Sequence, residues 1–124
     1  WNRHVHHAAV VEWFDADADR TWATCPVTEA GFVRVSSNAR AVGAALAPAE
    51  ARSVLARLRT DDGHRFLAND VSMTDESVPE VTGYRQVTDA LLLAVARRHG
   101  VRLVTFDAGL GGLGRAGEVE VLRA

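Results

Sequence analysis

Lysine is absent from this 124-residue sequence, and all fourteen of its basic residues are arginines. Arginine forks suit contacts with phosphates, but the net charge of −2 gives no overall attraction to nucleic acid, so any such contact must come from a local patch. Cysteine is nearly absent too. The single Cys25 excludes an internal disulfide framework and favours a reducing compartment, so we expect a cytoplasmic location.

Long apolar runs are also missing. No stretch approaches the roughly 20 residues of a membrane span, and nothing resembles a signal peptide, so we expect no association with a membrane. The 48% hydrophobic content and the length predict a single domain over residues 1–124, which can bury roughly two-thirds of its unfolded surface without disulfides.

Helices and strands are predicted to alternate along the chain. Apolar periodicity predicts helices over residues 4–18, 26–38, 48–60 and 87–98, and short strands over residues 22–25, 65–67, 102–106 and 118–122. Residues 69–83 are polar and form the longest predicted loop. This alternation predicts an α/β fold, a three-layer domain whose mostly parallel central sheet is flanked by helices.

A glycine-rich stretch follows the predicted strand 102–106. Gly109, Gly111 and Gly114 have the spacing of a dinucleotide-binding fingerprint. Only ten residues remain after Gly114, which leaves no room for the further strand–helix unit and ribose-binding acid that this function requires. A flexible turn is the preferred interpretation.

Three acidic residues stand beside apolar segments. Glu29 follows the strand that ends at Cys25, Asp89 begins the helix 87–98, and Asp107 ends the strand 102–106. Each has a simple structural explanation, such as satisfying a helix N-terminus. In an open parallel sheet, however, ligands bind beyond the carboxyl ends of the strands, and all three acids are expected at that edge.

Three carboxylates gathered without partners would repel one another and raise one another's pKa values, and a bound divalent cation removes that cost. Oxygen ligands suit Mg²⁺ or Mn²⁺ better than zinc. Such ions activate water and neutralise the charge of a phosphodiester undergoing cleavage. The spacing therefore predicts a metal-dependent nuclease or phosphatase.

A family resemblance makes this expectation more specific. The segments that carry it are CPVTEAGFVRVSSN (25–38), YRQVTDALLLAVARRHGVRLVTFDAGL (84–110) and EVEVL (118–122), and HVHHAA near the start also fits. In this order they resemble the PIN-domain ribonuclease toxins of the VapC type. The resemblance implies an acidic quartet that binds Mg²⁺ or Mn²⁺, endonucleolytic cleavage of structured RNA such as tRNA or rRNA, a homodimer, and inhibition by a cognate VapB antitoxin.

Three members of that quartet map onto Glu29, Asp89 and Asp107, which are thereby both the catalytic and the metal-binding candidates. Thr105, two residues before the last acid, matches a hydroxyl position beside the site. Thr88 is a second hydroxyl candidate, with capping of the helix 87–98 as its alternative role.

The fourth member of the quartet has no counterpart in the sequence. The family begins with an apolar strand that ends in Asp-x-Asn, whereas this sequence starts at Trp1 with a predicted helix. We expect the strand and its acid to lie upstream of Trp1 in the parent protein, and the chain as it stands to bind metal weakly and cleave little.

Arginines near the acidic edge are the candidates for RNA contacts. Arg34 and Arg40 follow Glu29, and Arg85 precedes Asp89. Two other functions stay open. A PIN-like module without catalysis would serve only as a partner-binding surface, and a small Mg²⁺-dependent phosphatase would need a nucleophilic aspartate after the upstream strand.

Overall fold

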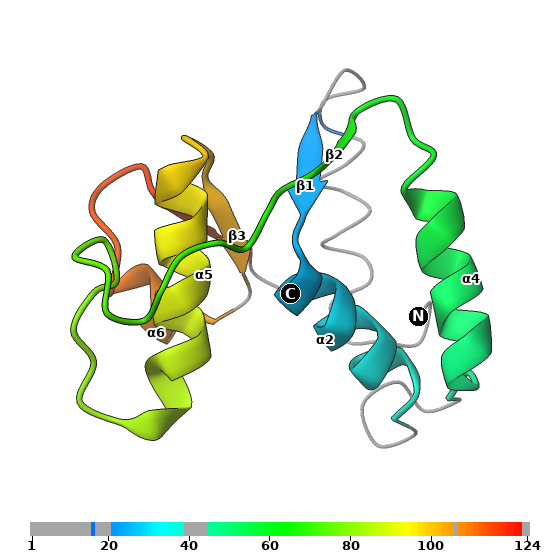
Figure 1. Ribbon diagram of the computed structural model, residues 1–124, viewed down its shortest axis with the longest axis horizontal. Helices are drawn as coiled ribbons and strands as arrows, with labels where there is room; N and C mark the ends of the chain where they lie inside the picture. The colour runs from blue at the N-terminus through cyan, green and yellow to red at the C-terminus, as the bar shows by residue number, and fades with distance from the viewer. Residues whose placement is uncertain (1–15, 17–20, 39–44, 106, 123–124) are drawn as a thin grey trace. The chain divides into compact units, whose positions relative to one another are not determined.

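The structure is a computed structural model that describes residue 16 and residues 21–38, 45–105 and 107–122. The predicted helix 4–18 lies outside the described residues, apart from residue 16. The chain divides into two units between Ala68 and Asn69, and their elements are labelled in Figure 1.

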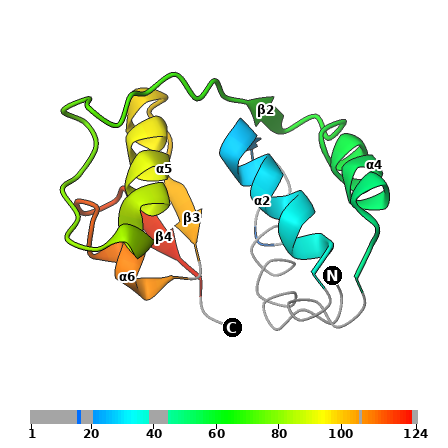
Figure 2. The ribbon, with the colours of Figure 1, turned by 60° about the horizontal axis from the view of Figure 1, so that its bottom comes forward.

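The first unit contains β1 (Trp22–Thr24), α2 (Pro26–Ser36), α4 (Pro48–Leu58) and β2 (His64–Phe66). Strands β1 and β2 are parallel, with Trp22 opposite His64 and Thr24 opposite Phe66. Parallel strands cannot be joined by a tight turn, and the connection between them carries α2 and α4, which pack against each other (Figure 2).

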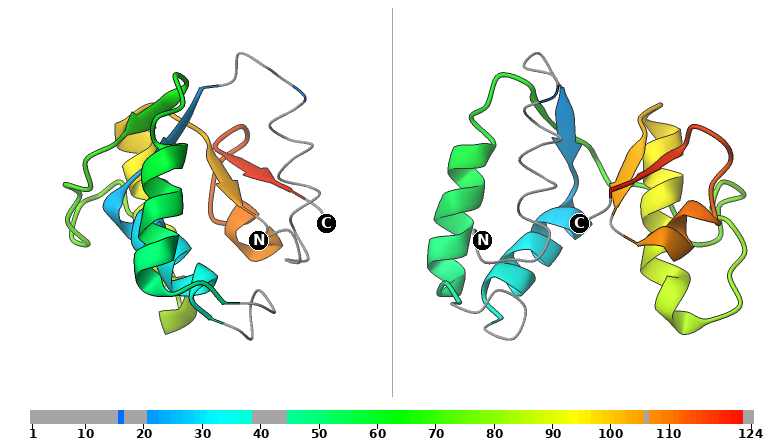
Figure 3. Two further views of the ribbon diagram at one scale, coloured as in Figure 1. Left: turned by 90° about the vertical axis from the view of Figure 1, so that its right-hand side faces the viewer. Right: turned by 180° about the vertical axis from the view of Figure 1, so that it is seen from behind.

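The second unit begins with a loop and then contains the 3-10 helix η1 (Tyr84–Gln86), α5 (Val87–Arg98), β3 (Leu103–Thr105), α6 (Ala108–Gly111) and β4 (Val119–Val121). Strands β3 and β4 are parallel, with Leu103 opposite Val119 and Thr105 opposite Val121. Helix α5 packs on β3 and α6 on β4 (Figure 3).

The core of the second unit is built on the apolar face of α5. Its buried residues are Ala90, Leu93, Ala94, Val95 and Ala96, joined by Leu110 of α6. In the first unit, Cys25, Ala51 and Leu67 are the buried hydrophobic residues. No helix among the described residues is long and apolar enough to cross a membrane.

The predicted α/β class and its parallel strands are confirmed. Helices begin at Pro26 and Pro48 as predicted, because proline at the first helical position loses no hydrogen bond there. The second strand covers His64–Phe66 rather than residues 65–67. Gly100 has φ = 65° and follows α5, as a left-handed exit requires.

The glycine-rich stretch was wrongly predicted as a flexible turn. Residues Ala108–Gly111 form the single-turn helix α6, whose first turn is capped by the Asp107 carboxylate. This short helix and the loop after it make the connection between the parallel strands β3 and β4. The prediction failed because propensity counts glycine against a helix, whereas here the cap and the burial of Leu110 fix the conformation.

Gly114 lies where the glycine-rich loop approaches the core. A Cβ atom at this position would lie 2.8 Å from Val119 Cγ2 and 3.6 Å from Leu93 Cδ2. At Gly112 the nearest such atom is the Gly109 carbonyl oxygen at 3.5 Å, and the backbone is helical, with φ = −73° and ψ = −16°.

We therefore expect Gly114→Ala to lower the free energy of unfolding by about 1–3 kcal/mol, because the β-branched Val119 cannot move aside freely. Gly112→Ala is the matched control and should be neutral or stabilising by less than about 1 kcal/mol. Urea unfolding measures both. Equal midpoints for the two variants would show that the loop is not packed as described.

An arginine–glutamate pair ties the second unit together. Arg97 donates hydrogen bonds from Nε to Glu118 Oε2 at 2.8 Å and from Nη2 to Glu118 Oε1 at 2.9 Å. Its Nη1 reaches the Ser77 carbonyl oxygen at 2.8 Å, which fastens the 69–83 loop to α5. These bonds from Arg97, with a further one from the Arg115 backbone N–H, lower the pKa of Glu118 to about 2.

The pKa of Glu118 lies below its ordinary value of 4.5, so the stability that this carboxylate adds is complete above pH 4.5 and is lost as the pH falls toward 2. We expect wild type to lose more stability between pH 7 and pH 3 than Glu118→Gln, as measured by urea midpoints. Glu120→Gln is the control, because its Arg102 partner lies 3.8 Å away and is 56% exposed. Identical pH dependence in wild type and Glu118→Gln would contradict the assignment.

Candidate functional site

Glu29 lies in the first turn of α2 and its side chain is only 15% exposed. Thr24 Oγ1, at the end of β1, donates a hydrogen bond to Glu29 Oε2 at 2.6 Å. The same oxygen lies 3.5 Å from Arg59 Nε. Among the described residues, no hydrogen bond reaches Oε1, so this oxygen is available to a ligand.

The turn from β1 into α2 fixes the start of the helix that carries Glu29. The Thr28 hydroxyl accepts the Cys25 backbone N–H at 2.9 Å and donates to the Cys25 carbonyl oxygen at 3.0 Å. Pro26 occupies the first helical position, and Glu29 N–H then makes the first backbone bond, to the Cys25 carbonyl. Only residues 25–28 thus separate the end of β1 from the acid Glu29.

A histidine extends this arrangement. His64 Nε2 lies 2.8 Å from Thr24 Oγ1, and its ring contacts the edge of Trp22, with ring centroids 4.6 Å apart. Burial, and then the positive charge of Arg59, lower the pKa of His64, against the opposing effects of Glu29 and Asp61.

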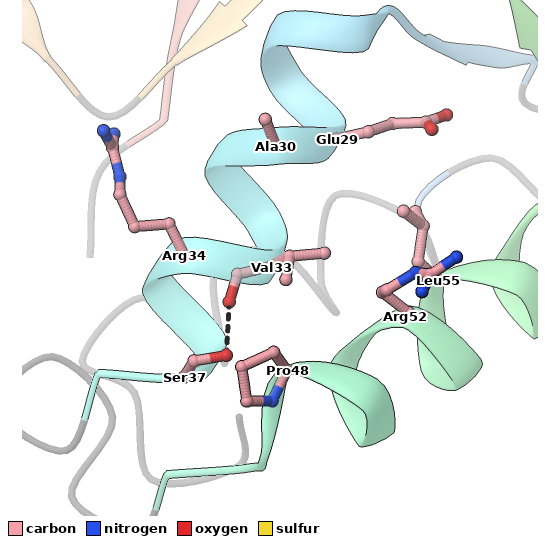
Figure 4. Close-up of a pocket in the computed structure, with 8 residues that line it drawn as sticks. All are labelled: Glu29, Ala30, Val33, Arg34, Ser37, Pro48, Arg52 and Leu55. Carbon is pink, nitrogen blue, oxygen red and sulfur yellow. Dashed lines mark hydrogen bonds between the residues drawn. The ribbon is translucent and has the colours of Figure 1, made fainter.

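Glu29 also borders an open groove between α2 and α4, with a volume of about 550 Å³ (Figure 4). The other lining residues are Ala30, Val33, Arg34, Ser37, Pro48, Arg52 and Leu55. Figure 4 shows the Glu29 side chain extending from α2 on the side opposite to that of Arg34. The groove therefore combines an apolar floor with one acid and two arginines.

Asp89 and Asp107 are brought into electrostatic contact in the second unit. Asp89 lies half-buried in the first turn of α5. Burial, and then the negative charge of Asp107, raise the pKa of Asp89. Among the described residues, no arginine or histidine forms an ion pair with either acid. Their mutual repulsion is the electrostatic pattern that a cation would relieve.

Thr105 and Asp107 form a short hydrogen-bonded turn at the end of β3. The Asp107 backbone N–H donates to Thr105 Oγ1 at 3.1 Å, and Asp107 Oδ1 accepts the Gly109 backbone N–H at 2.8 Å. Within the described residues, the second carboxylate oxygen of Asp107 receives no hydrogen bond. Thr105 thus holds the backbone of the acid, and its place beside a metal site stays a prediction.

The other sequence candidates have different outcomes. Thr88 is exposed and does not cap α5, whose N-cap is Gln86, so the capping alternative was wrong; its place beside the site stays a prediction. Arg34 is exposed at the last turn of α2. Arg40 lies outside the described residues. Arg85 is exposed, and its guanidinium lies 5.8 Å from the Tyr84 ring centroid.

Glu29 belongs to the first unit, and Asp89 and Asp107 belong to the second. Their meeting at one cation therefore stays a prediction. Within each unit, the described His, Cys, Asp and Glu side chains form no group of three or more that could hold a metal ion.

Sequence reasoning missed Thr24 and His64. One signal was available: Trp22 and Thr24 alternate along a strand and so share one face. That His64 lies on the same face depends on the register between β1 and β2, which the sequence of the connecting helices does not specify.

Comparisons with known proteins show the family to which the chain belongs. Residues 1–115 match the PIN domain family. The chain is 62% identical to ribonuclease VapC38 of Mycobacterium tuberculosis (strain ATCC 25618 / H37Rv) over 110 residues, which cover 89% of this chain and 78% of the relative.

Two further relatives come from M. tuberculosis strain CDC 1551 / Oshkosh. Identity to ribonuclease VapC39 is 46% over 125 residues, covering 98% of this chain and 90% of that protein. Identity to ribonuclease VapC29 is 39% over 119 residues, covering 96% of this chain and 84% of that protein. The chain therefore belongs to the PIN-domain family, among its VapC-type ribonuclease toxins.

Proposed function

We propose that this protein is a metal-dependent endoribonuclease, the toxin of a toxin–antitoxin pair, and that Glu29, Asp89 and Asp107 bind Mg²⁺ or Mn²⁺. The observation that carries the proposal is the pair of acids in the second unit, where burial and then the charge of Asp107 raise the pKa of Asp89. Two adjacent carboxylates without a described cationic partner destabilise the metal-free protein, and they suit a divalent cation.

The donor set fits such an ion because every candidate ligand is a carboxylate oxygen. When bound, the metal ion would activate water and neutralise charge on the phosphodiester. The chain's own residues prepare the site. Thr105 and Gly109 fix Asp107 by hydrogen bonds to its backbone and to Oδ1, and Thr24 fixes one oxygen of Glu29.

RNA is the proposed substrate, with structured tRNA or rRNA as the class that the VapC resemblance implies. The names of the relatives, ribonucleases VapC38, VapC39 and VapC29, support an activity on RNA. A cognate VapB antitoxin, a homodimer and a cytoplasmic location complete the proposal. An acidic site needs positive groups nearby to hold a polyanionic substrate, and the exposed Arg34 and Arg85 are candidates.

The first experiment concerns Asp89→Asn in the natural full-length protein. The pKa of Asp89 is raised above its ordinary value of 3.8, so the ionised carboxylate lowers the stability of the folded protein at neutral pH. This cost decreases as the pH falls through the raised pKa, and it is gone below pH 3.8. Without metal, we expect the variant to melt no lower than wild type. It should lose Mn²⁺-dependent RNA cleavage, and it should also lose the stabilisation by Mn²⁺, which for wild type is about 2.7 kcal/mol in the free energy of unfolding at 100 times Kd and is measured as a rise in melting temperature.

Asp70→Asn is the matched control, because Asp70 is an exposed acid of the same unit that pairs with Arg98 at 3.0 Å. It should keep both cleavage and the response to Mn²⁺. Cleavage retained by Asp89→Asn would restrict Asp89 to a role at the helix terminus. Mn²⁺ binding without any RNA cleavage in wild type would favour the phosphatase, and absence of both would favour the partner-binding module.

A second experiment concerns how RNA is held near Asp89. Tyr84 is 82% exposed, one turn before α5, and Arg85 Nε lies 3.4 Å from its hydroxyl. An exposed aromatic ring backed by a guanidinium suits stacking of an unpaired base, which contributes about 1–3 kcal/mol per base. Tyr84→Ala should therefore raise KM for RNA by about 5- to 150-fold with kcat little changed.

Tyr84→Trp should preserve KM, because it keeps a stacking surface. Met73→Ala, which truncates another exposed apolar side chain of the same unit, is the control. If Tyr84→Ala and Met73→Ala leave KM equally unchanged, Tyr84 does not bind the substrate.

A further inference from the structure

We propose that His64 and Thr24 are positioning residues for Glu29, linked by a directed chain of hydrogen bonds that runs from His64 Nε2 through Thr24 Oγ1 to Glu29 Oε2. The two links measure 2.8 Å and 2.6 Å. The inference rests on the proposed function, since it assumes that Glu29 serves a metal site. It adds two residues to which neither the sequence motifs nor the family resemblance assigned a role.

The direction of the chain follows from counting protons. A threonine hydroxyl has a single proton to donate, and an ionised carboxylate can only accept. Thr24 must therefore give its proton to Glu29. The contact between Thr24 and His64 can then form only if His64 Nε2 carries a proton and donates it to Thr24 Oγ1. The arrangement thus requires a proton on Nε2 of His64.

The sheet holds His64 in the position that this chain requires. His64 is opposite Trp22 in the parallel pair of strands, and its ring contacts the Trp22 ring. Trp22 is itself anchored, because its Nε1 donates to Asp61 Oδ2 at 2.8 Å. The imidazole is therefore bounded by Trp22 on the same face of the sheet and bonded to Thr24 two residues further along β1.

The consequence for Glu29 is a fixed carboxylate. One oxygen is engaged by Thr24, with Arg59 at 3.5 Å, and no described hydrogen bond holds the other. Groups that bond a metal-binding carboxylate or imidazole typically contribute 10- to 100-fold in metal affinity. We expect Thr24 and His64 to change metal affinity by a similar factor, because they orient Glu29 and do not themselves contact RNA or metal.

The test measures Mn²⁺ affinity by titration calorimetry, together with kcat and KM for RNA cleavage, in the natural full-length protein. Thr24→Val removes the hydroxyl at constant shape and should weaken Mn²⁺ binding about 10- to 100-fold, with KM for RNA little changed. His64→Ala should do the same. Thr24→Ser restores the hydroxyl, and His64→Gln restores an N–H donor at a similar reach, so both should lie within about threefold of wild type.

A double variant separates the hydrogen-bond chain from general disruption of the strands. If His64 acts only through Thr24, His64→Ala should cost nothing more in a Thr24→Val background. Additive losses would overturn the proposal. Arg65→Ala is the control for β2, because Arg65 is an exposed neighbour of His64 on that strand, and it should leave Mn²⁺ affinity unchanged.

Nitrogen-15 NMR of labelled histidine gives a readout that is independent of metal and activity. A protonated Nε2 of His64 is expected at pH 7.5, and an unprotonated Nε2 would reverse the first link and overturn the proposal. Glu29→Gln distinguishes the two levels of inference. If that variant keeps Mn²⁺ binding and cleavage, the metal site itself is misassigned. If it loses both while Thr24→Val and His64→Ala bind Mn²⁺ like wild type, only the positioning chain fails.

Discussion

Parallel pairing of very short strands is the constraint on which the rest of the structure depends. Strands of three residues such as β1 and β3 offer few ladder bonds, and their parallel partners are reached only through long connections. Each connection begins as a helix directly after the strand. The residues at the strand ends, Thr24 and Thr105, therefore lie beside helix N-termini, where carboxylates are favoured by the helix dipole. In both units a threonine ends the strand and an acid follows within five residues.

The two units use the same threonine chemistry in different ways. Thr24 donates its hydroxyl proton to the Glu29 side chain, whereas Thr105 accepts the backbone N–H of Asp107. The first contact orients a carboxylate, and the second fixes the backbone from which a carboxylate projects. Glu29 also has the cationic Arg59 nearby, while Asp89 is partly buried beside the like charge of Asp107 and forms no ion pair with any described residue. The electrostatic cost of the proposed site is therefore concentrated in the second unit, and it is offset there by the buried face of α5 and the Arg97–Glu118 pair.

Much of the fold and part of the candidate site could be predicted from the sequence. The first residues of α2 and α4 and both ends of α5 follow from prolines, glycine and apolar periodicity, which are local properties, whereas α2 and α4 end at Ser36 and Leu58 rather than at the predicted residues 38 and 60. Glu29, Asp89 and Asp107 were found because each interrupts an apolar segment. Helix α6 was missed because its stability comes from the Asp107 cap and from Leu110 burial, and His64 was missed because its role depends on strand register. The register of β1 and β2 joins segments distant in the sequence. The Asp107 cap is local, but the low helix propensity of glycine concealed it.

Strand register also explains why one particular ring nitrogen of His64 must carry a proton, although the sequence around His64 shows no catalytic motif. A histidine opposite a tryptophan is ordinarily a packing residue, and here burial and then the charge of Arg59 lower its pKa, against the opposing effects of Glu29 and Asp61. Thr24 donates its only hydroxyl proton to Glu29. The register of β1 and β2 places His64 Nε2 beside Thr24, so this ring nitrogen must carry the proton of the second hydrogen bond. Strand pairing, helix initiation and the orientation of an acid are thus consequences of one geometric constraint.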